Sequence, residues 1–206
     1  MPRPDRPDSA AGAFTYPQFP LHTHMIDELL RYNKDFVARK AYEPYVTTKY
    51  PDKKIAIVAC MDTRLVQLLP ASLGLRNGDV KLIKVAGGVV LQPFDSVVRS
   101  LIVAVYELGV EEIMIVGHTD CGAQHMNAPE LIHKMTSRGV PPDHIDMMAY
   151  SGIDFEHWLS GFDATETAVS QSVHLVRHHP LMPADLIVRG FIMNSHTGLF
   201  TEVEAD

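Results

Sequence analysis

Two short segments of the chain together contain five residues whose side chains are suited to metal binding or proton transfer. The first segment contains Cys60, Asp62 and Arg64, and the second contains His118 and Cys121. Two thiolates and one imidazole form a typical ligand set for zinc, and a site with three protein ligands keeps a fourth position free for water. The sequence therefore predicts a catalytic zinc ion (Zn2+) bound by Cys60, His118 and Cys121.

The Asp62 carboxylate has two possible partners. It follows Cys60 by two residues, so it could become a fourth zinc ligand in a closed state of the site. Arg64 follows two residues later, and in an extended segment its side chain would point to the same side and compete for the carboxylate. This pattern predicts a switch, although a structural ion pair between Asp62 and Arg64 would explain the same spacing.

His118 and Cys121 are three residues apart, so a turn that enters a helix would bring both side chains to one side. The free amides of that helix N-terminus would then stabilise the Cys121 thiolate. The chain has only two cysteines, and in a reducing compartment such separated thiols are more typical of metal ligands or reactive groups than of a disulfide. A disulfide and a purely structural zinc site are the less favoured alternatives.

Apolar runs that alternate with helical patterns predict the elements that position these residues. The expected strands are 55–59, 80–85, 113–116, 186–193 and 199–203, and the expected helices are 25–42, 65–73, 96–108 and 165–178. Gly117 is expected to end the third strand, and residues 125–165 are expected to form short helices and loops. This order predicts an α/β fold with a mostly parallel central sheet, an antiparallel edge strand and flanking helices. Both chemical segments should meet at the carboxyl edge of the sheet, where such sheets bind ligands.

Composition limits the class of protein. The chain has 206 residues, of which 46% are hydrophobic, and this predicts a single domain over 21–206 after a flexible, proline-rich arm at 1–20. A formal net charge of -7 without a basic cluster argues against a nucleic-acid partner. No run approaches the roughly 18–20 apolar residues of a membrane span, and no signal peptide is evident, so we expect a cytoplasmic protein without a membrane partner.

With these residues in place, the chain resembles the beta-class carbonic anhydrases, especially the shorter prokaryotic members. Their signature is Cys-x-Asp-x-Arg followed by His-x-x-Cys, and the likeness extends from about residue 25 to Val203. The resemblance implies reversible hydration of carbon dioxide to bicarbonate and a proton by attack of zinc-bound hydroxide, with Asp62 and Arg64 as a catalytic dyad. It also implies a homodimer or higher homo-oligomer with active sites at the subunit interface. Because two thiolates cancel the charge of zinc, we expect activity to rise into the alkaline range.

One departure concerns the presumed substrate pocket. Many family members have Arg-Asn where this chain has Lys84 and Val85, so polar groups are fewer near the pocket. Carbon dioxide is small and apolar, and Val85, Gly87 and Gly88 are candidates for a nonpolar niche beside the metal. A tightly packed turn explains the two glycines at least as well.

Three other functions fit the same residues. The first is hydrolysis of carbon disulfide or carbonyl sulfide on the same zinc site. The second is a zinc-binding sensor protein with little turnover, and the third is a redox protein that uses Cys60 and Cys121 as free thiols. Nucleotide binding has no support, because neither G-x-x-x-x-G-K-[ST] nor G-x-G-x-x-G occurs.

Overall fold

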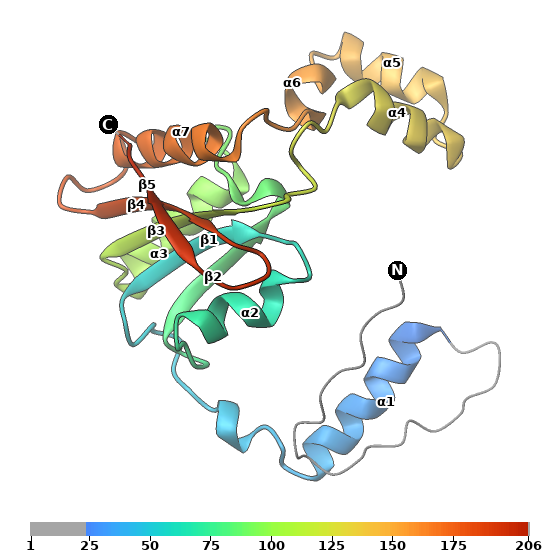
Figure 1. Ribbon diagram of the computed structural model, residues 1–206. Helices are drawn as coiled ribbons and strands as arrows, with labels where there is room; N and C mark the ends of the chain where they lie inside the picture. The colour runs from blue at the N-terminus through green and yellow to red at the C-terminus, as the bar shows by residue number, and fades with distance from the viewer. Residues whose placement is uncertain (1–23, 206) are drawn as a thin grey trace. The chain divides into compact units, whose positions relative to one another are not determined.

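The computed structural model describes residues 24–205, and a five-stranded sheet forms the core of the compact unit that begins at Thr47 (Figure 1). Its strands are β1 (Ile55–Cys60), β2 (Val80–Val85), β3 (Glu112–His118), β4 (Ile187–Met193) and β5 (Phe200–Val203). They lie in the order β2-β1-β3-β4-β5, and all neighbours are parallel except the antiparallel pair β4 and β5. The predicted fold class is confirmed.

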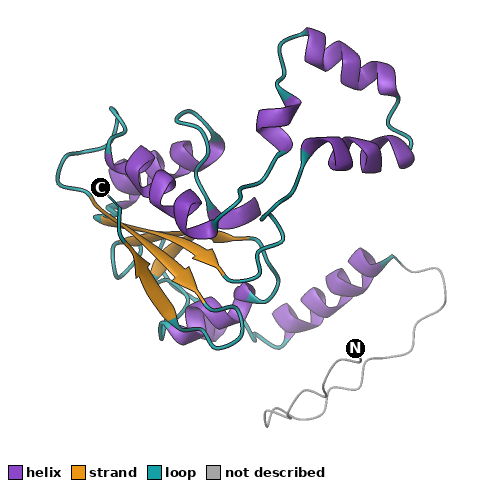
Figure 2. Ribbon diagram, turned by 45° about the horizontal axis from the view of Figure 1, so that its top comes forward, coloured by secondary structure: helices purple, strands orange, loops and turns teal. Residues whose placement is uncertain are grey.

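Helices cover both faces of this sheet (Figure 2). The helices α3 (Ser96–Leu108) and α7 (Thr165–Arg177) pack on one face, where their buried side chains belong to the same apolar cluster as Ala56 and Val58 of β1. The helix α2 (Leu65–Ser72) packs on the other face against Ile57 and Ala59. Side chains alternate between the faces of a strand, so a central strand covered on both sides needs a continuous apolar run, as β1 has.

The described residues before Thr47 belong to a separate compact unit. This part contains α1 (Met25–Ala38) and the short 3-10 helix η1 (Glu43–Tyr45). The prediction that the first helix reaches residue 42 was wrong, because the chain adopts a left-handed conformation at Lys40, with φ 54°, soon after Ala38. The predicted arm at 1–20 lies outside the described residues, and the single domain over 21–206 stays a prediction.

The strand β3 continues through Gly117 and His118, so the prediction that Gly117 ends it was wrong. A Cβ atom at Gly117 would lie 2.7 Å from Cγ2 of Thr165 and 2.8 Å from Cγ2 of Val169. The missing side chain therefore lets α7 pack closely on the sheet. As a result, His118 is the last residue of a regular strand.

Three short helices occupy the polar region 125–165, as predicted: α4 (Ala128–Ser137), α5 (Pro142–Tyr150) and α6 (Phe155–Leu159). Backbone hydrogen bonds join the two ends of this helical segment, since His125 N donates to Phe162 O and Gly161 N donates to Met126 O. Within residues 24–205, no helix is both long and apolar enough to cross a membrane. The cytoplasmic location and the lack of a nucleic-acid partner stay predictions.

Candidate metal centre

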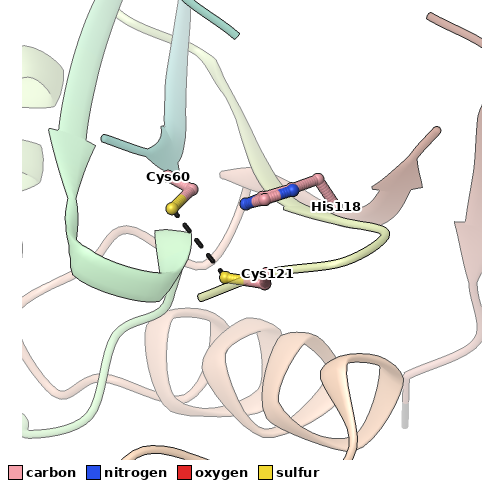
Figure 3. A group of neighbouring side chains, drawn as sticks. All are labelled: Cys60, His118 and Cys121. Carbon is pink, nitrogen blue, oxygen red and sulfur yellow. Dashed lines mark hydrogen bonds between the residues drawn. The ribbon is translucent and has the colours of Figure 1, made fainter. Parts of the chain in front are cut away.

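The carboxyl ends of β1 and β3 bring the predicted zinc ligands together (Figure 3). The two strands are adjacent and parallel, and Cys60 and His118 are their last residues. Cys121 follows His118 after a short turn. All three side chains are buried, so a bound ion would be held away from bulk water by the protein.

The geometry of these three residues fits a tetrahedral metal ion. Their ligand atoms all lie within 4.8 Å of one another. The two sulfur atoms are 3.9 Å apart and form no disulfide. Two thiolates on one zinc ion, each about 2.3 Å from the metal, would be separated by roughly 3.8 Å. The observed sulfur separation therefore needs almost no adjustment on binding.

His118 presents an unused nitrogen to the sulfur pair. Its Nδ1 lies 2.9 Å from the carbonyl oxygen of Thr119, and because a carbonyl can only accept, Nδ1 carries the proton. Nε2 is buried and has no hydrogen-bond partner among the described residues. A buried acceptor without a partner is costly, and a metal ion bound at Nε2 would remove that cost.

The two thiols share a proton. The hydrogen bond between them holds the pKa of Cys60 well below its usual range, and the same contact raises the pKa of Cys121. Burial opposes protonation of His118, but its interactions with Cys60 and with the carbonyl oxygen of Thr119 together outweigh burial and raise the pKa of His118. The cluster therefore holds negative charge on Cys60, which a cation can neutralise.

The predicted helix start at Cys121 was wrong. Turns follow Cys121, and the next helix, α4, begins at Ala128. The His118 ring and the Cys121 thiol instead lie on the same side of this segment because Asp120, between them, has a left-handed backbone with φ 55°. Cys121 therefore gains no stabilisation of its thiolate from the N-terminus of a helix.

Asp62 and Arg64 form the predicted pair through three hydrogen bonds. Oδ1 of Asp62 accepts from the backbone N of Arg64 at 2.8 Å and from its Nε at 3.0 Å, and Oδ2 accepts from Nη2 at 2.8 Å. These contacts lower the pKa of Asp62 to about 2 and raise that of Arg64. The segment is not extended as expected, since Arg64 has helical dihedrals and immediately precedes α2. Asp62 is not part of the ligand cluster, so its role as a fourth ligand stays a prediction.

The candidate pocket residues lie where β2 ends, at Val85 and the 3-10 turn η2 (Ala86–Gly88). Gly87 and Gly88 are buried and have positive φ angles. A Cβ atom at Gly88 would lie 2.6 Å from the backbone N of Cys60, and one at Gly87 would lie 2.9 Å from Cε1 of Phe162. These contacts give the glycines a packing function, and binding of substrate by Val85, Gly87 and Gly88 stays a prediction.

Lys84 places an ammonium group inside the protein near this edge. Its Nζ is buried without a hydrogen-bond partner among residues 24–205. Burial lowers the pKa of Lys84, while the negative charges of Cys60 and Asp62 oppose that change. A cation close to the thiolates favours their charged form.

The sequence did not identify three residues that hold the site in place. Thr119 and Ser195 join the ends of β3 and β4, since Ser195 N donates to Thr119 Oγ1 at 3.1 Å and the two hydroxyls are 3.2 Å apart. This contact fixes the residue whose carbonyl orients His118. Asp120 contacts Arg64, and its position inside the His-x-x-Cys segment was the one available signal.

A mostly parallel α/β sheet with two cysteines and one histidine gathered at its carboxyl edge defines a protein with a candidate metal centre. Comparison with known proteins gives its family. The family profile described as carbonic anhydrase matches residues 55–199. The crystal structure of beta-carbonic anhydrase isoform I (TvaCA1) from Trichomonas vaginalis is 32% identical, with a TM-score of 0.81 over 89% of this chain and 99% of that one. The chain belongs to the beta-carbonic anhydrase family of enzymes, as the sequence predicted.

Two further relatives show the range of this similarity. The protein YtiB of Bacillus subtilis (strain 168) is 46% identical over 174 residues, which cover 84% of this chain and 93% of YtiB. A carbon disulfide hydrolase from Acidithiobacillus thiooxidans is 27% identical over 156 residues, covering 71% and 75% of the two chains. The chain is therefore similar both to a beta-carbonic anhydrase and to a carbon disulfide hydrolase, which are named for different substrates.

Proposed function

We propose that the protein is a zinc-dependent carbonic anhydrase that interconverts carbon dioxide and water with bicarbonate and a proton. Cys60, His118 and Cys121 hold the zinc ion. The observation that carries this proposal is the buried Nε2 of His118, which lacks a partner among the described residues and lies beside two sulfur atoms 3.9 Å apart. Two sulfurs and one imidazole are donors that zinc prefers, and three protein ligands are typical of its catalytic sites.

A zinc ion bound there would polarise water and allow it to attack carbon dioxide near neutral pH. The oxygen lone pair forms the new C–O bond while one C=O electron pair moves onto oxygen, and the proton of water leaves to solvent. The protein must hold the attacking oxygen beside an apolar gas. Phe162 and Ala123 pack against the cluster that contains Cys60 and Cys121, and they supply apolar surface there.

Asp62 and Arg64 act as a dyad that orients the attacking oxygen. Arg64 supplies two donors to Oδ1 of Asp62 but one to Oδ2, so Oδ2 keeps an acceptor lone pair. With a pKa of about 2, Asp62 stays ionised at all pH values at which the enzyme would work. Its carboxylate can therefore accept a hydrogen bond from the nucleophile but does not serve as the group that titrates near neutral pH.

Stopped-flow hydration of carbon dioxide tests this function directly. The zinc-loaded protein should hydrate carbon dioxide faster at alkaline than at mildly acidic pH, and Asp62→Asn should bind equal zinc but lose most of the rate. Lys34→Glu, an exposed change on α1, serves as a control with normal activity. A zinc-loaded wild-type protein without hydration activity would exclude the proposal.

Hydrolysis of carbon disulfide or carbonyl sulfide is the second candidate, because the chain is similar to a carbon disulfide hydrolase. Both substrates are linear and apolar like carbon dioxide, so the same three ligands and dyad would serve. Release of hydrogen sulfide from carbon disulfide, measured on the same zinc-loaded sample, separates the two activities. A sensor protein would bind zinc and show neither activity, whereas a redox protein would retain both thiols free after incubation with zinc.

The active form is a homodimer or a higher homo-oligomer. Large apolar side chains are exposed on the described parts of both compact units, including Leu29 and Leu30 on α1 and Met61 next to Cys60. Exposed apolar surface of this kind favours association. Sedimentation velocity should give at least twice the mass of one chain, and the double change Leu29→Glu with Leu30→Glu should lower it while Lys34→Glu does not. Bicarbonate, carbon dioxide and a second copy are then the partners of the chain.

A further inference from the structure

We propose that Asp120 is a positioning residue that locks Arg64 onto Asp62 and thereby keeps the Asp62 carboxylate away from the metal. This inference rests on the function proposed above. Its geometric basis is a double contact between Asp120 and one guanidinium group. Nη1 of Arg64 donates to Oδ2 of Asp120 at 2.7 Å, and Nη2 donates to the backbone carbonyl of Asp120, also at 2.7 Å.

Two aspartate residues hold the guanidinium group of Arg64. Nε and Nη2 face Asp62, while Nη1 and the second N–H of Nη2 face Asp120. Four of the five guanidinium N–H groups are therefore used. A planar group held at both ends cannot rotate away from Asp62 without breaking its contacts with Asp120.

The backbone at Asp120 supports the same role. Its φ of 55° lies in the left-handed region, which costs energy for most residues and is best tolerated by Gly, Asn and Asp. In this conformation both the carbonyl and the carboxylate of Asp120 contact the guanidinium of Arg64. Since Asp120 lies between His118 and Cys121 and Arg64 follows Cys60, the contact also links the two ligand-bearing segments.

The contact between Asp120 and Arg64 matters because the Asp62 carboxylate can pair either with Arg64 or with the metal. If Arg64 is held in place, Asp62 keeps its guanidinium partner and an exogenous anion or water can reach the open metal position. If Arg64 is released, Asp62 can compete for that position. The Asp120 carboxylate is largely exposed, with 79% of its side-chain area accessible, so solvent screens the contact and its loss should change the balance only about fivefold.

Anion binding to the cobalt-substituted protein tests the lock without measuring turnover. Cobalt(II) absorbs visible light according to its coordination, and azide titrated into the sample reports how freely the open position can be occupied. Asp120→Gly removes the carboxylate and still permits positive φ, and Asp120→Asn keeps shape and removes charge. Asp185→Asn, at an exposed residue outside the site, is the matched control.

We expect Asp120→Gly to weaken azide binding about fivefold when Asp62 is present, and to leave it unchanged in an Asp62→Asn background. Asp120→Asn should act in the same direction, and Asp185→Asn should have no effect. Equal losses in both backgrounds, or lower cobalt affinity in both, would show that Asp120 only supports the fold of the loop and would overturn the lock. Unchanged azide affinity in both Asp120 variants would overturn it as well.

Failure of the lock and failure of the proposed function remain distinguishable. Wild-type protein that hydrates carbon dioxide but shows no Asp120 effect on azide affinity refutes the lock alone. Wild-type protein that binds cobalt and shows the Asp120 effect, yet hydrates no carbon dioxide, refutes the proposed function alone. A chain that binds no cobalt refutes both.

Discussion

Gly88 provides a quantitative test of how tightly the backbone packs around the candidate metal centre. A Cβ atom at Gly88 would lie 2.6 Å from Cys60 N, 2.8 Å from Val116 O and 3.0 Å from Ala59 C. These are backbone atoms of two central strands and cannot rotate aside as a side chain does. The φ of 69° adds the cost of a left-handed conformation. Gly74 is a matched control, because its φ is 63° and, apart from its two chain neighbours, no atom of the described residues lies within 4 Å of its Cβ position.

The two substitutions should therefore differ in their effect on stability. Gly74→Ala should cost about 1 kcal/mol, the left-handed penalty less the entropy that alanine removes from the unfolded chain. Gly88→Ala adds overpacking of about 1–3 kcal/mol, for a total of about 2–4 kcal/mol. A loss of that size is a large share of the roughly 5–15 kcal/mol that stabilises a typical domain.

Urea unfolding of the metal-free variants, followed by circular dichroism, measures this difference. Zinc affinity gives a second reading, because the nearest clash is with the backbone N of Cys60 and should move its sulfur relative to Cys121. We expect Gly88→Ala to weaken zinc binding at least about tenfold and Gly74→Ala to leave it unchanged. Equal losses of stability in the two variants, with unchanged zinc affinity, would refute the packing derived for Gly88.

Three further predictions concern charged groups at the same edge. Asp62→Asn should lower the rate of carbon dioxide hydration about 100-fold, because the attacking oxygen loses its orientation, without loss of zinc, and stopped-flow rates with metal analysis of one sample would check this. Arg64→Gln should raise the carboxyl pKa of Asp62 from about 2 toward 3.8, as followed by carbon NMR. Because folding lowers this pKa, the pair stabilises wild-type protein above about pH 4, and that contribution should disappear as the pH falls through about 2. An unchanged titration of Asp62 in the Arg64→Gln variant would contradict the prediction. Lys84→Met should raise the urea midpoint, because it removes a buried ammonium without a partner in the described chain, and a lower midpoint would mean that Lys84 is paired in the assembled protein.

The sequence predicted the sheet and the ligand cluster for clear physical reasons. A central strand covered on both faces must be continuously apolar, so the run before Cys60 was recognisable as β1. Parallel strands end at the same edge, so residues that follow two adjacent strands had to lie near each other. This reasoning brought Cys60, His118 and Cys121 together across a separation of 61 residues.

Errors arose where local pattern conflicted with tertiary contacts. Gly117 reads as a strand break, but the close approach of α7 requires a residue without a side chain there. The left-handed Asp120 could not be inferred from residue spacing, and the contact of Thr119 with Ser195 joins residues 76 positions apart. The positions of Asp120 and Ser195 at the site depend on the folded backbone and on no periodic signal in the sequence.

X-ray absorption at the zinc edge of the loaded protein tests most directly whether one ion gathers these three ligands. We predict one zinc ion per chain with two sulfur neighbours at about 2.3 Å, one imidazole nitrogen at about 2.0 Å and one further light atom. Cys60→Ser and Cys121→Ser should each remove one sulfur neighbour. A shell without sulfur, or one that neither substitution changes, would contradict a metal centre formed by Cys60, His118 and Cys121.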